Sequence, residues 1–227
     1  MKYIWLIIFF VLPLLGVSYT AWRIWHVLPF SNSWRWAAVA LFMALFGSMF
    51  LGLSGTIEKM PLNAATVVYE IGNSFVFILL YLVMIFLVLD LGRLAHIIPK
   101  AWLSGNGYTS LGILAIMLLV FVYGNVHYYN KVREHINIKT NKELALNGKQ
   151  TAKIVLLSDL HLGYHNRCSE FKRWVDMINA EQPDLVLIAG DIIDISVRPL
   201  LQEHVAEEFH RLKAPVYACL GNHEYYS

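Results

Sequence analysis

Four long apolar runs fill most of the first 130 residues, and they limit the folds open to this chain more than any other feature. Each run is long enough to cross roughly 30 Å of hydrocarbon, which takes about 20 helical residues. The runs lie near residues 3–22, 34–53, 68–91 and 109–127. Since 57% of all residues are hydrophobic and only 15% are charged, one ordinary soluble domain is excluded. We expect residues 1–130 to form an α-helical membrane domain with the lipid bilayer as its partner.

The charged residues divide the chain near Asn130. Residues 1–130 carry six Lys/Arg and three Asp/Glu, whereas residues 131–227 carry twelve and thirteen. The net charge of +2 is too small to indicate a nucleic-acid partner, because acids balance the bases of the second half. We therefore expect no nucleic acid to bind, and a soluble domain after the membrane domain.

The basic residues near the span ends favour a cytoplasmic soluble domain in this multi-pass protein. Four spans place both termini on one side of the membrane, and basic residues tend to stay on the cytoplasmic side. The side of the termini has six such residues: Lys2, Lys59, Lys131, Arg133, Lys139 and Lys142. The other side has four: Arg23, Arg35, Arg93 and Lys100. The side of the termini thus has two basic residues more than the other side.

Three polar residues in the third run open an alternative function. Glu70, Asn73 and Asp90 lie within or at the edge of this run, where an unpaired charge costs several kcal/mol. They are compatible with an ion or proton path in a transporter or sensor. They are also compatible with acids at the two membrane interfaces and an amide that bonds a neighbouring helix, in which case the helices are a plain anchor.

The second half alternates short apolar runs with helical patterns. Residues 131–150 are polar and predict a linker with one strand near 135–139. Apolar runs at 153–157, 184–189 and 216–220 have the length of buried strands. Helices are predicted between them, over 170–181 and from Pro199 onward, the latter with a single apolar stripe made by Leu201, Val205, Phe209 and Leu212. The order β-α-β-α-β predicts a mostly parallel sheet in an α/β domain over residues 151–227.

Each predicted strand ends in a polar cluster. These clusters are Ser158-Asp159-Leu160-His161, Gly190-Asp191 and Gly221-Asn222-His223-Glu224. Because ligands of such sheets gather beyond the carboxyl ends of the strands, we expect the clusters to share one rim. Asp159 and His161 are two residues apart, so in an extended segment both side chains grip one metal. Asp191 has two oxygens with which to bridge two ions, Asn222 offers an amide oxygen, and His223 is a proton donor.

The three clusters together resemble the calcineurin-like metallophosphoesterases, whose pattern runs D-x-H, then G-D, then G-N-H-[D/E]. The resemblance covers residues from about 151 to the end, and it extends to members with apolar N-terminal spans. It implies that Asp159 and His161 bind a first metal and that Asp191 bridges to a second, which Asn222 binds. His223 would stabilise or protonate the leaving oxygen as the catalytic residue.

The resemblance also implies a chemistry and a substrate class. Two divalent ions such as Mn²⁺, Fe or Zn²⁺ would hold the phosphoryl group and supply a hydroxide nucleophile for hydrolysis of phosphate mono- or diesters or pyrophosphates. Some membrane-associated relatives cleave the pyrophosphate of UDP-2,3-diacylglucosamine in lipid A biosynthesis, which points to a lipid-linked substrate.

The end of the sequence departs from the family pattern. Family members continue with another histidine and a G-H-x-H element, whereas this sequence ends at Ser227. We therefore expect only the first βαβαβ half of the phosphoesterase sandwich, in a fragment or a truncated gene product. This polypeptide alone is expected to hold metal weakly, to be inactive and to expose one side of its sheet. A non-catalytic remnant is the further alternative.

Overall fold

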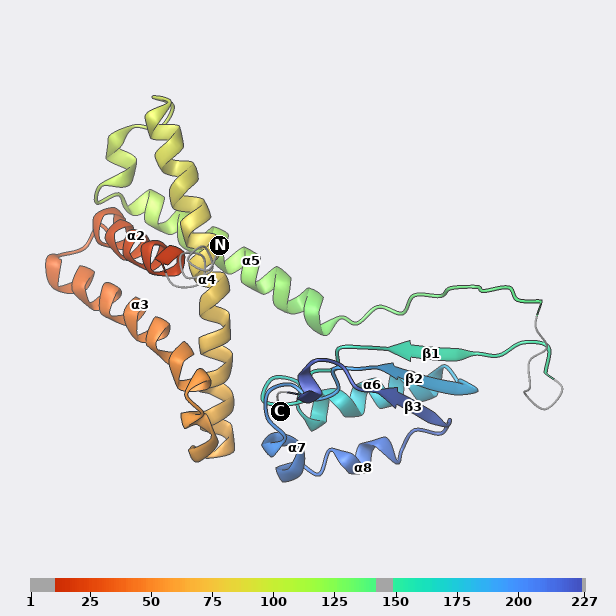
Figure 1. The fold of residues 1–227 in the computed structure, drawn as a ribbon. Helices are drawn as coiled ribbons and strands as arrows, with labels where there is room; N and C mark the ends of the chain where they lie inside the picture. Colours follow the sequence, from red (N-terminus) through yellow and green to blue (C-terminus); the bar gives the residue numbers. More distant parts are fainter. Residues whose placement is uncertain (1–10, 142–148, 226–227) are drawn as a thin grey trace, which may run out of the picture. The chain divides into compact units, whose positions relative to one another are not determined.

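A computed structural model describes residues 11–141 and 149–225 of the chain (Figure 1). The chain forms two compact units. The helical unit comprises Met1–Ser54 and Ile71–His135, and the α/β unit comprises Gly55–Glu70 and Ile136–Ser227. The segment 55–70, which joins two membrane helices in sequence, thus belongs to the α/β unit.

The helical unit contains the expected apolar helices. They are α2 (Leu12–Val27), α3 (Asn32–Leu53), α4 (Leu62–Leu94) and α5 (Gly107–Tyr129), with the short η3 (Lys100–Leu103) before α5. Within the described part of the chain, three helices are long and apolar enough to cross a membrane, namely α3, α4 and α5. The expected membrane domain is confirmed with this difference in helix count. The first predicted span, 3–22, begins in residues outside the described ranges, and α2 continues five residues beyond its predicted end.

An ion pair joins the last part of α2 to α4. Arg23 is 5% exposed, and its guanidinium pairs with the Asp90 carboxylate of α4. Its Nε donates to Asp90 Oδ2 at 2.9 Å, and the Tyr19 hydroxyl donates to the same oxygen at 2.5 Å. Asp90 is therefore a paired structural charge, which weakens the interpretation of this residue as part of an ion path. Apolar clusters around Phe42 and Phe86 complete the packing.

Helix α4 is longer than its apolar run. Its 33 residues extend about 50 Å, well beyond the roughly 30 Å of a hydrocarbon core. The helix begins at Leu62 rather than near residue 68, because the less apolar residues 62–67 are helical within the α/β unit, where Ala65 is buried in a cluster with Tyr164. The short η2 (Thr56–Lys59) precedes it.

The α/β unit is a parallel sheet with helices against one face. Strands β1 (Ile154–Leu157), β2 (Leu185–Ala189) and β3 (Val216–Cys219) lie side by side in the order β1-β2-β3 (Figure 1). Both neighbouring pairs are parallel, with Leu157 opposite Ile188 and Ile188 opposite Ala218. The predicted parallel sheet is confirmed.

One face of this sheet carries the core. Helix α6 (Cys168–Ala180) presents Phe171 and Val175, both fully buried, to Val186 of β2. The opposite face is open, since Ile154, Leu156 and Tyr217 are 51%, 68% and 66% exposed. The prediction of three buried strands is therefore wrong for β1 and β3, whereas the expectation of one exposed side agrees with the structure.

Two further predictions are wrong. The single helix from Pro199 is divided into α7 (Arg198–Gln202) and α8 (Ala206–Phe209). His204 between them has φ 54°, outside the helical region, and Leu201 is 70% exposed while Leu200 packs on the core in its place. Glu203 in this turn accepts the Cys168 N–H at 2.9 Å, and so serves the start of α6 instead of continuing a helix.

The strand predicted near 135–139 is also absent from the described linker residues. Ile136 and Ile138 are 74% and 86% exposed, so the alternating pattern has no apolar surface to cover and no strand to pair with.

Candidate metal centre

The three polar clusters meet at one edge of the sheet, as expected from the parallel strands. The loop after β1 runs beside the loop after β2 and is hydrogen-bonded to it. The Asp159 N–H donates to the Gly190 carbonyl at 3.3 Å, and the His161 N–H donates to the Asp191 carbonyl at 2.9 Å. Backbone hydrogen bonds therefore continue beyond the strands and hold the first two clusters together.

Three of the predicted metal ligands have left-handed backbone conformations. The φ angles are 55° for Asp159, 42° for His161 and 50° for Asp191. A residue other than glycine in this region costs of order 1–3 kcal/mol, and such residues concentrate at functional sites. The unfavourable backbone conformation thus occurs at the three positions where a carboxylate or imidazole is directed to the rim.

Two glycines allow the second and third clusters to approach each other. Gly190 has φ 77°, and a Cβ atom there would lie 2.7 Å from Gly221 Cα. A Cβ atom on Gly221 would overlap Asp191 Oδ1 and lie 2.5 Å from the Asp191 backbone nitrogen. Glycine is therefore required at both positions by the close backbone contact, which sets the place of the Asp191 carboxylate.

Asp159, His161 and Asp191 form a first donor group. Their ligand atoms lie within 4.8 Å of one another. His161 Nε2 is 3.9 Å from Asp159 Oδ1 and 4.0 Å from Asp191 Oδ2. These separations are too long for hydrogen bonds, but they match two ligands at about 2.1 Å from one ion, which lie up to about 4.2 Å apart. The donor set of two carboxylates and an imidazole thus fits a divalent transition metal.

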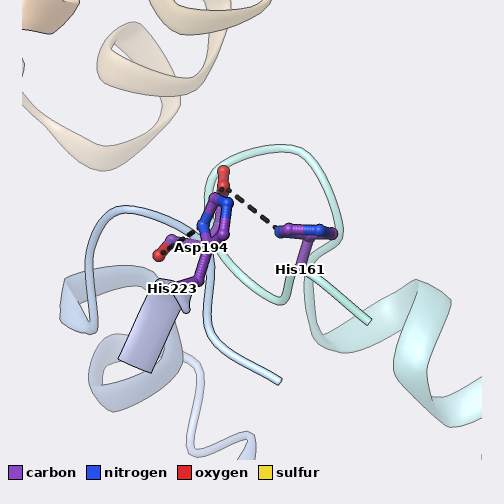
Figure 2. Close-up of side chains that lie close together, drawn as sticks. All are labelled: His161, Asp194 and His223. Carbon is purple, nitrogen blue, oxygen red and sulfur yellow. Dashed lines mark hydrogen bonds and ion pairs between the residues drawn. The ribbon is translucent and has the colours of Figure 1, made fainter. Parts of the chain in front are cut away.

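Asp194 joins a second donor group with His161 and His223 (Figure 2). Its Oδ1 atom is 3.7 Å from His161 Nδ1 and 3.6 Å from His223 Nδ1. The two imidazole rings are 4.4 Å apart and nearly perpendicular. His161 therefore faces the first group through Nε2 and Asp194 through Nδ1, the latter at an ion-pair distance that exceeds a hydrogen bond.

Sequence analysis did not identify Asp194. The available signal was a second aspartate in the same loop, three residues after Asp191 and separated from it by two isoleucines. Its 9% exposure is low for a carboxylate that lies in a loop. Nothing in the sequence shows that it lies between two histidines 33 and 29 residues away.

The residues of the third cluster differ in their contacts with the donor groups. The His223 N–H donates to Asp191 Oδ1 at 3.0 Å, so this residue is attached to the predicted bridging carboxylate. Asn222 is exposed, and its carbonyl accepts the Tyr225 N–H at the start of η4 (His223–Tyr225). The structure thus brings together Asp159, His161, Asp191 and His223, and places Asn222 next to them in sequence on the open side of the rim.

Glu224 organises the backbone behind the site. Its carboxylate accepts four backbone N–H groups, those of Asp191, Ile192, Ile193 and Gly221, at 2.6–3.0 Å. Burial alone would raise the pKa of Glu224, but the four donors outweigh it and lower the pKa to about 2. The carboxylate is therefore ionised and joins the loops after β2 and β3.

The geometry is accompanied by a family match. The model of the calcineurin-like phosphoesterases matches residues 152–227, the region that contains all three clusters. Residues 152–227 belong to the calcineurin-like phosphoesterases. The donor groups described above are therefore those of a phosphoesterase domain, and the predicted family is confirmed for this part of the chain.

Three curated relatives extend the comparison. A transmembrane protein with metallophosphoesterase domain from Danio rerio is 28% identical over 199 residues, which are 86% of this chain and 45% of that protein. The UDP-2,3-diacylglucosamine pyrophosphatase of Chlamydia trachomatis is 32% identical over 117 residues, 50% of this chain and 34% of the relative. A Campylobacter jejuni metallophosphoesterase is 30% identical over 115 residues, 50% of this chain and 29% of the relative.

The chain therefore spans less than half the length of these relatives. The match to the Danio rerio protein is long enough to include apolar helices as well as the phosphoesterase domain. No solved structure gives a significant match to this chain.

Proposed function

We propose that this protein is a membrane-bound, metal-dependent hydrolase of phosphate esters or pyrophosphates. The observation that supports the proposal most is the donor group of Asp159, His161 and Asp191 at the carboxyl edge of the sheet. Two divalent ions, Mn²⁺, Fe or Zn²⁺, would supply polarisation of the phosphoryl group and a hydroxide nucleophile at neutral pH.

Each predicted site residue has its own role in this proposal. Asp159 and His161 would hold the first ion, and Asp191 would hold both ions. Asp159 is 65% exposed at its side chain, which leaves this side of the site open to substrate. Asn222 would hold the second ion with its amide oxygen. These assignments follow the family pattern at the matching positions.

His223 donates the proton that the leaving oxygen needs. His223 Nδ1 faces Asp194, at 3.4 Å from its backbone carbonyl oxygen and 3.6 Å from Oδ1. Nε2 is therefore the ring nitrogen that would transfer the proton. The hydrogen bond from the His223 N–H to Asp191 Oδ1 keeps His223 beside the predicted bridging carboxylate.

We further propose a lipid-linked phosphate substrate such as UDP-2,3-diacylglucosamine. Two findings support this choice: the membrane-capable helices on the same chain, and the printed activity of the Chlamydia trachomatis relative. The excess of basic residues on the side of the termini supports a cytoplasmic location of the domain.

Membranes that contain the full-length gene product provide the test. Hydrolysis of bis(p-nitrophenyl) phosphate and of UDP-2,3-diacylglucosamine is measured with Mn²⁺ present. Asp191→Asn is expected to lower the rate at least about 100-fold. Asp176→Asn, an exposed aspartate of α6 that pairs with Arg211, is the matched control and is expected to retain the rate. Equal rates for the two variants would remove the proposal, and hydrolysis of the diester alone would remove the lipid substrate.

A further inference from the structure

The segment 55–70 forms part of the α/β unit although it connects two membrane helices in the sequence. Ile57 and Ala65 of this segment are 1% and 0% exposed, and they share a core cluster with the fully buried Tyr164 of the loop after β1. The ring of Tyr69 lies 5.4 Å from the ring of Tyr164 in the same cluster. The beginning of α4 is therefore packed against the loop that carries the first metal ligands.

Polar contacts hold this segment in a defined position. The Arg198 guanidinium donates to the carbonyls of Ile57 at 3.1 Å and Met60 at 2.5 Å. The Tyr164 hydroxyl donates to Glu58 Oε1 at 2.9 Å. Burial and this acidic neighbour raise the pKa of the Tyr164 phenol. The hydroxyl therefore keeps its proton and remains the donor in this bond.

Tyr69 continues these contacts into the metal centre. Its hydroxyl donates to Asp194 Oδ2 at 2.5 Å. The other oxygen of the same carboxylate, Oδ1, faces His161 Nδ1 and His223 Nδ1 at 3.7 and 3.6 Å. Figure 2 shows the contact between this carboxylate and His161 as a dashed line. One oxygen of Asp194 is thus occupied by α4, and the rotation of the carboxylate about its bond to Cβ is restricted.

We infer that Tyr69 is a positioning residue for the metal centre, acting through Asp194 on His161 and His223. The inference rests on the proposed function and adds a residue from a membrane helix to the phosphoesterase site. When the hydroxyl is removed, Asp194 loses the contact that orients it, and His161 loses the fixed carboxylate that aligns its ring. Residues that orient metal-binding histidines typically affect metal affinity 10- to 100-fold.

Tyr164 offers a matched control within the same cluster. Both tyrosines join the segment 55–70 to the loops of the α/β unit, and both donate to one carboxylate. The carboxylate bonded to Tyr164 is Glu58, which belongs to neither donor group. Tyr69→Phe and Tyr164→Phe therefore remove the same hydroxyl group within one cluster, from a partly buried ring and a fully buried ring respectively. They differ in whether the lost bond leads to a metal centre.

The experiment measures Mn²⁺ affinity of the full-length gene product in detergent by calorimetry, with the thermal unfolding midpoint of each variant. Tyr69→Phe is expected to weaken Mn²⁺ binding about 10-fold, and Tyr164→Phe less than about 2-fold, with comparable unfolding midpoints. In the Asp194→Asn background, Tyr69→Phe is expected to have no further effect. Equal weakening by both tyrosine variants would show a purely structural role and overturn the inference.

Phosphodiester hydrolysis by the same preparations separates this inference from the proposed function. Mn²⁺ binding with the expected ratio but no hydrolysis under any metal would overturn the function and support the role of Tyr69. Hydrolysis and Mn²⁺ binding that are both unchanged in Tyr69→Phe would support the function and overturn the inference. A wild-type chain that binds no Mn²⁺ would contradict both.

Discussion

The Glu224 carboxylate accepts the backbone N–H of Asp191 at 3.0 Å and so links the loops after β2 and β3. The same carboxylate accepts the N–H groups of Ile192, Ile193 and Gly221. Four donors converge on one ionised group, whose pKa they lower to about 2. The position of Asp191 is thus set by a side chain that is itself outside both donor groups.

Glu224→Gln is expected to destabilise the α/β unit by about 3 kcal/mol. Hydrogen bonds to charged acceptors contribute about 1.5–3 kcal/mol each, and the new amide group would place its own donors against backbone N–H groups. Chemical denaturation in detergent measures the free energy of unfolding. Glu207→Gln, an exposed glutamate of α8, is the control and should change it by less than about 0.5 kcal/mol. Similar values for the two variants would show that the four hydrogen bonds contribute little.

Gly221→Ala tests the close contact between the second and third clusters. The added Cβ atom would overlap Asp191 Oδ1, so the loop must move and the predicted bridging carboxylate with it. We expect a loss of at least about 2 kcal/mol in unfolding free energy and weaker Mn²⁺ binding. Gly124→Ala on α5 has open space around it and is expected to be neutral or to stabilise by up to about 1 kcal/mol. A Gly221→Ala protein with unchanged Mn²⁺ affinity would contradict the packing described for the rim.

The sequence was sufficient to predict the elements whose signal is local. The runs at 153–157, 184–189 and 216–220 are strands because they are short, branched and apolar, and their order predicts a parallel sheet with its polar ends on one edge. Asp159, His161, Asp191 and His223 come together for that reason. The spacing of Phe171 and Val175 similarly predicts the buried face of α6.

The remaining features depend on contacts between distant residues. The role of Asp194 depends on its contacts with two histidines that are distant in the sequence. The role of Tyr69 depends on the packing of α4 beside the loop after β1 and on the hydrogen bond to Asp194. The division of the helix after Pro199 reflects the hydrogen bond from Cys168 to Glu203, which joins residues 35 positions apart. Periodicity describes neighbours along the chain and contains no information of this kind.

Asp90→Asn is expected to destabilise the helical unit by about 3 kcal/mol. Removal of one partner leaves the buried Arg23 guanidinium without its counter-charge, and such changes cost about 3–5 kcal/mol. The double variant Arg23→Met with Asp90→Leu removes both charges and should be considerably milder. Thermal unfolding in detergent compares the two. A double variant less stable than Asp90→Asn would contradict the interpretation of this ion pair as structural.

The most direct test of the central claim is metal removal and restoration in membranes that contain the full-length gene product. Phosphodiester hydrolysis is measured before EDTA treatment, after it, and after addition of Mn²⁺, Fe²⁺ or Zn²⁺ in turn. Because Asp159, His161 and Asp191 would hold ions that supply the nucleophile, we predict loss of hydrolysis with EDTA and recovery with at least one of the three metals. Hydrolysis that persists through EDTA treatment, or that no metal supports at any stage, would contradict the account.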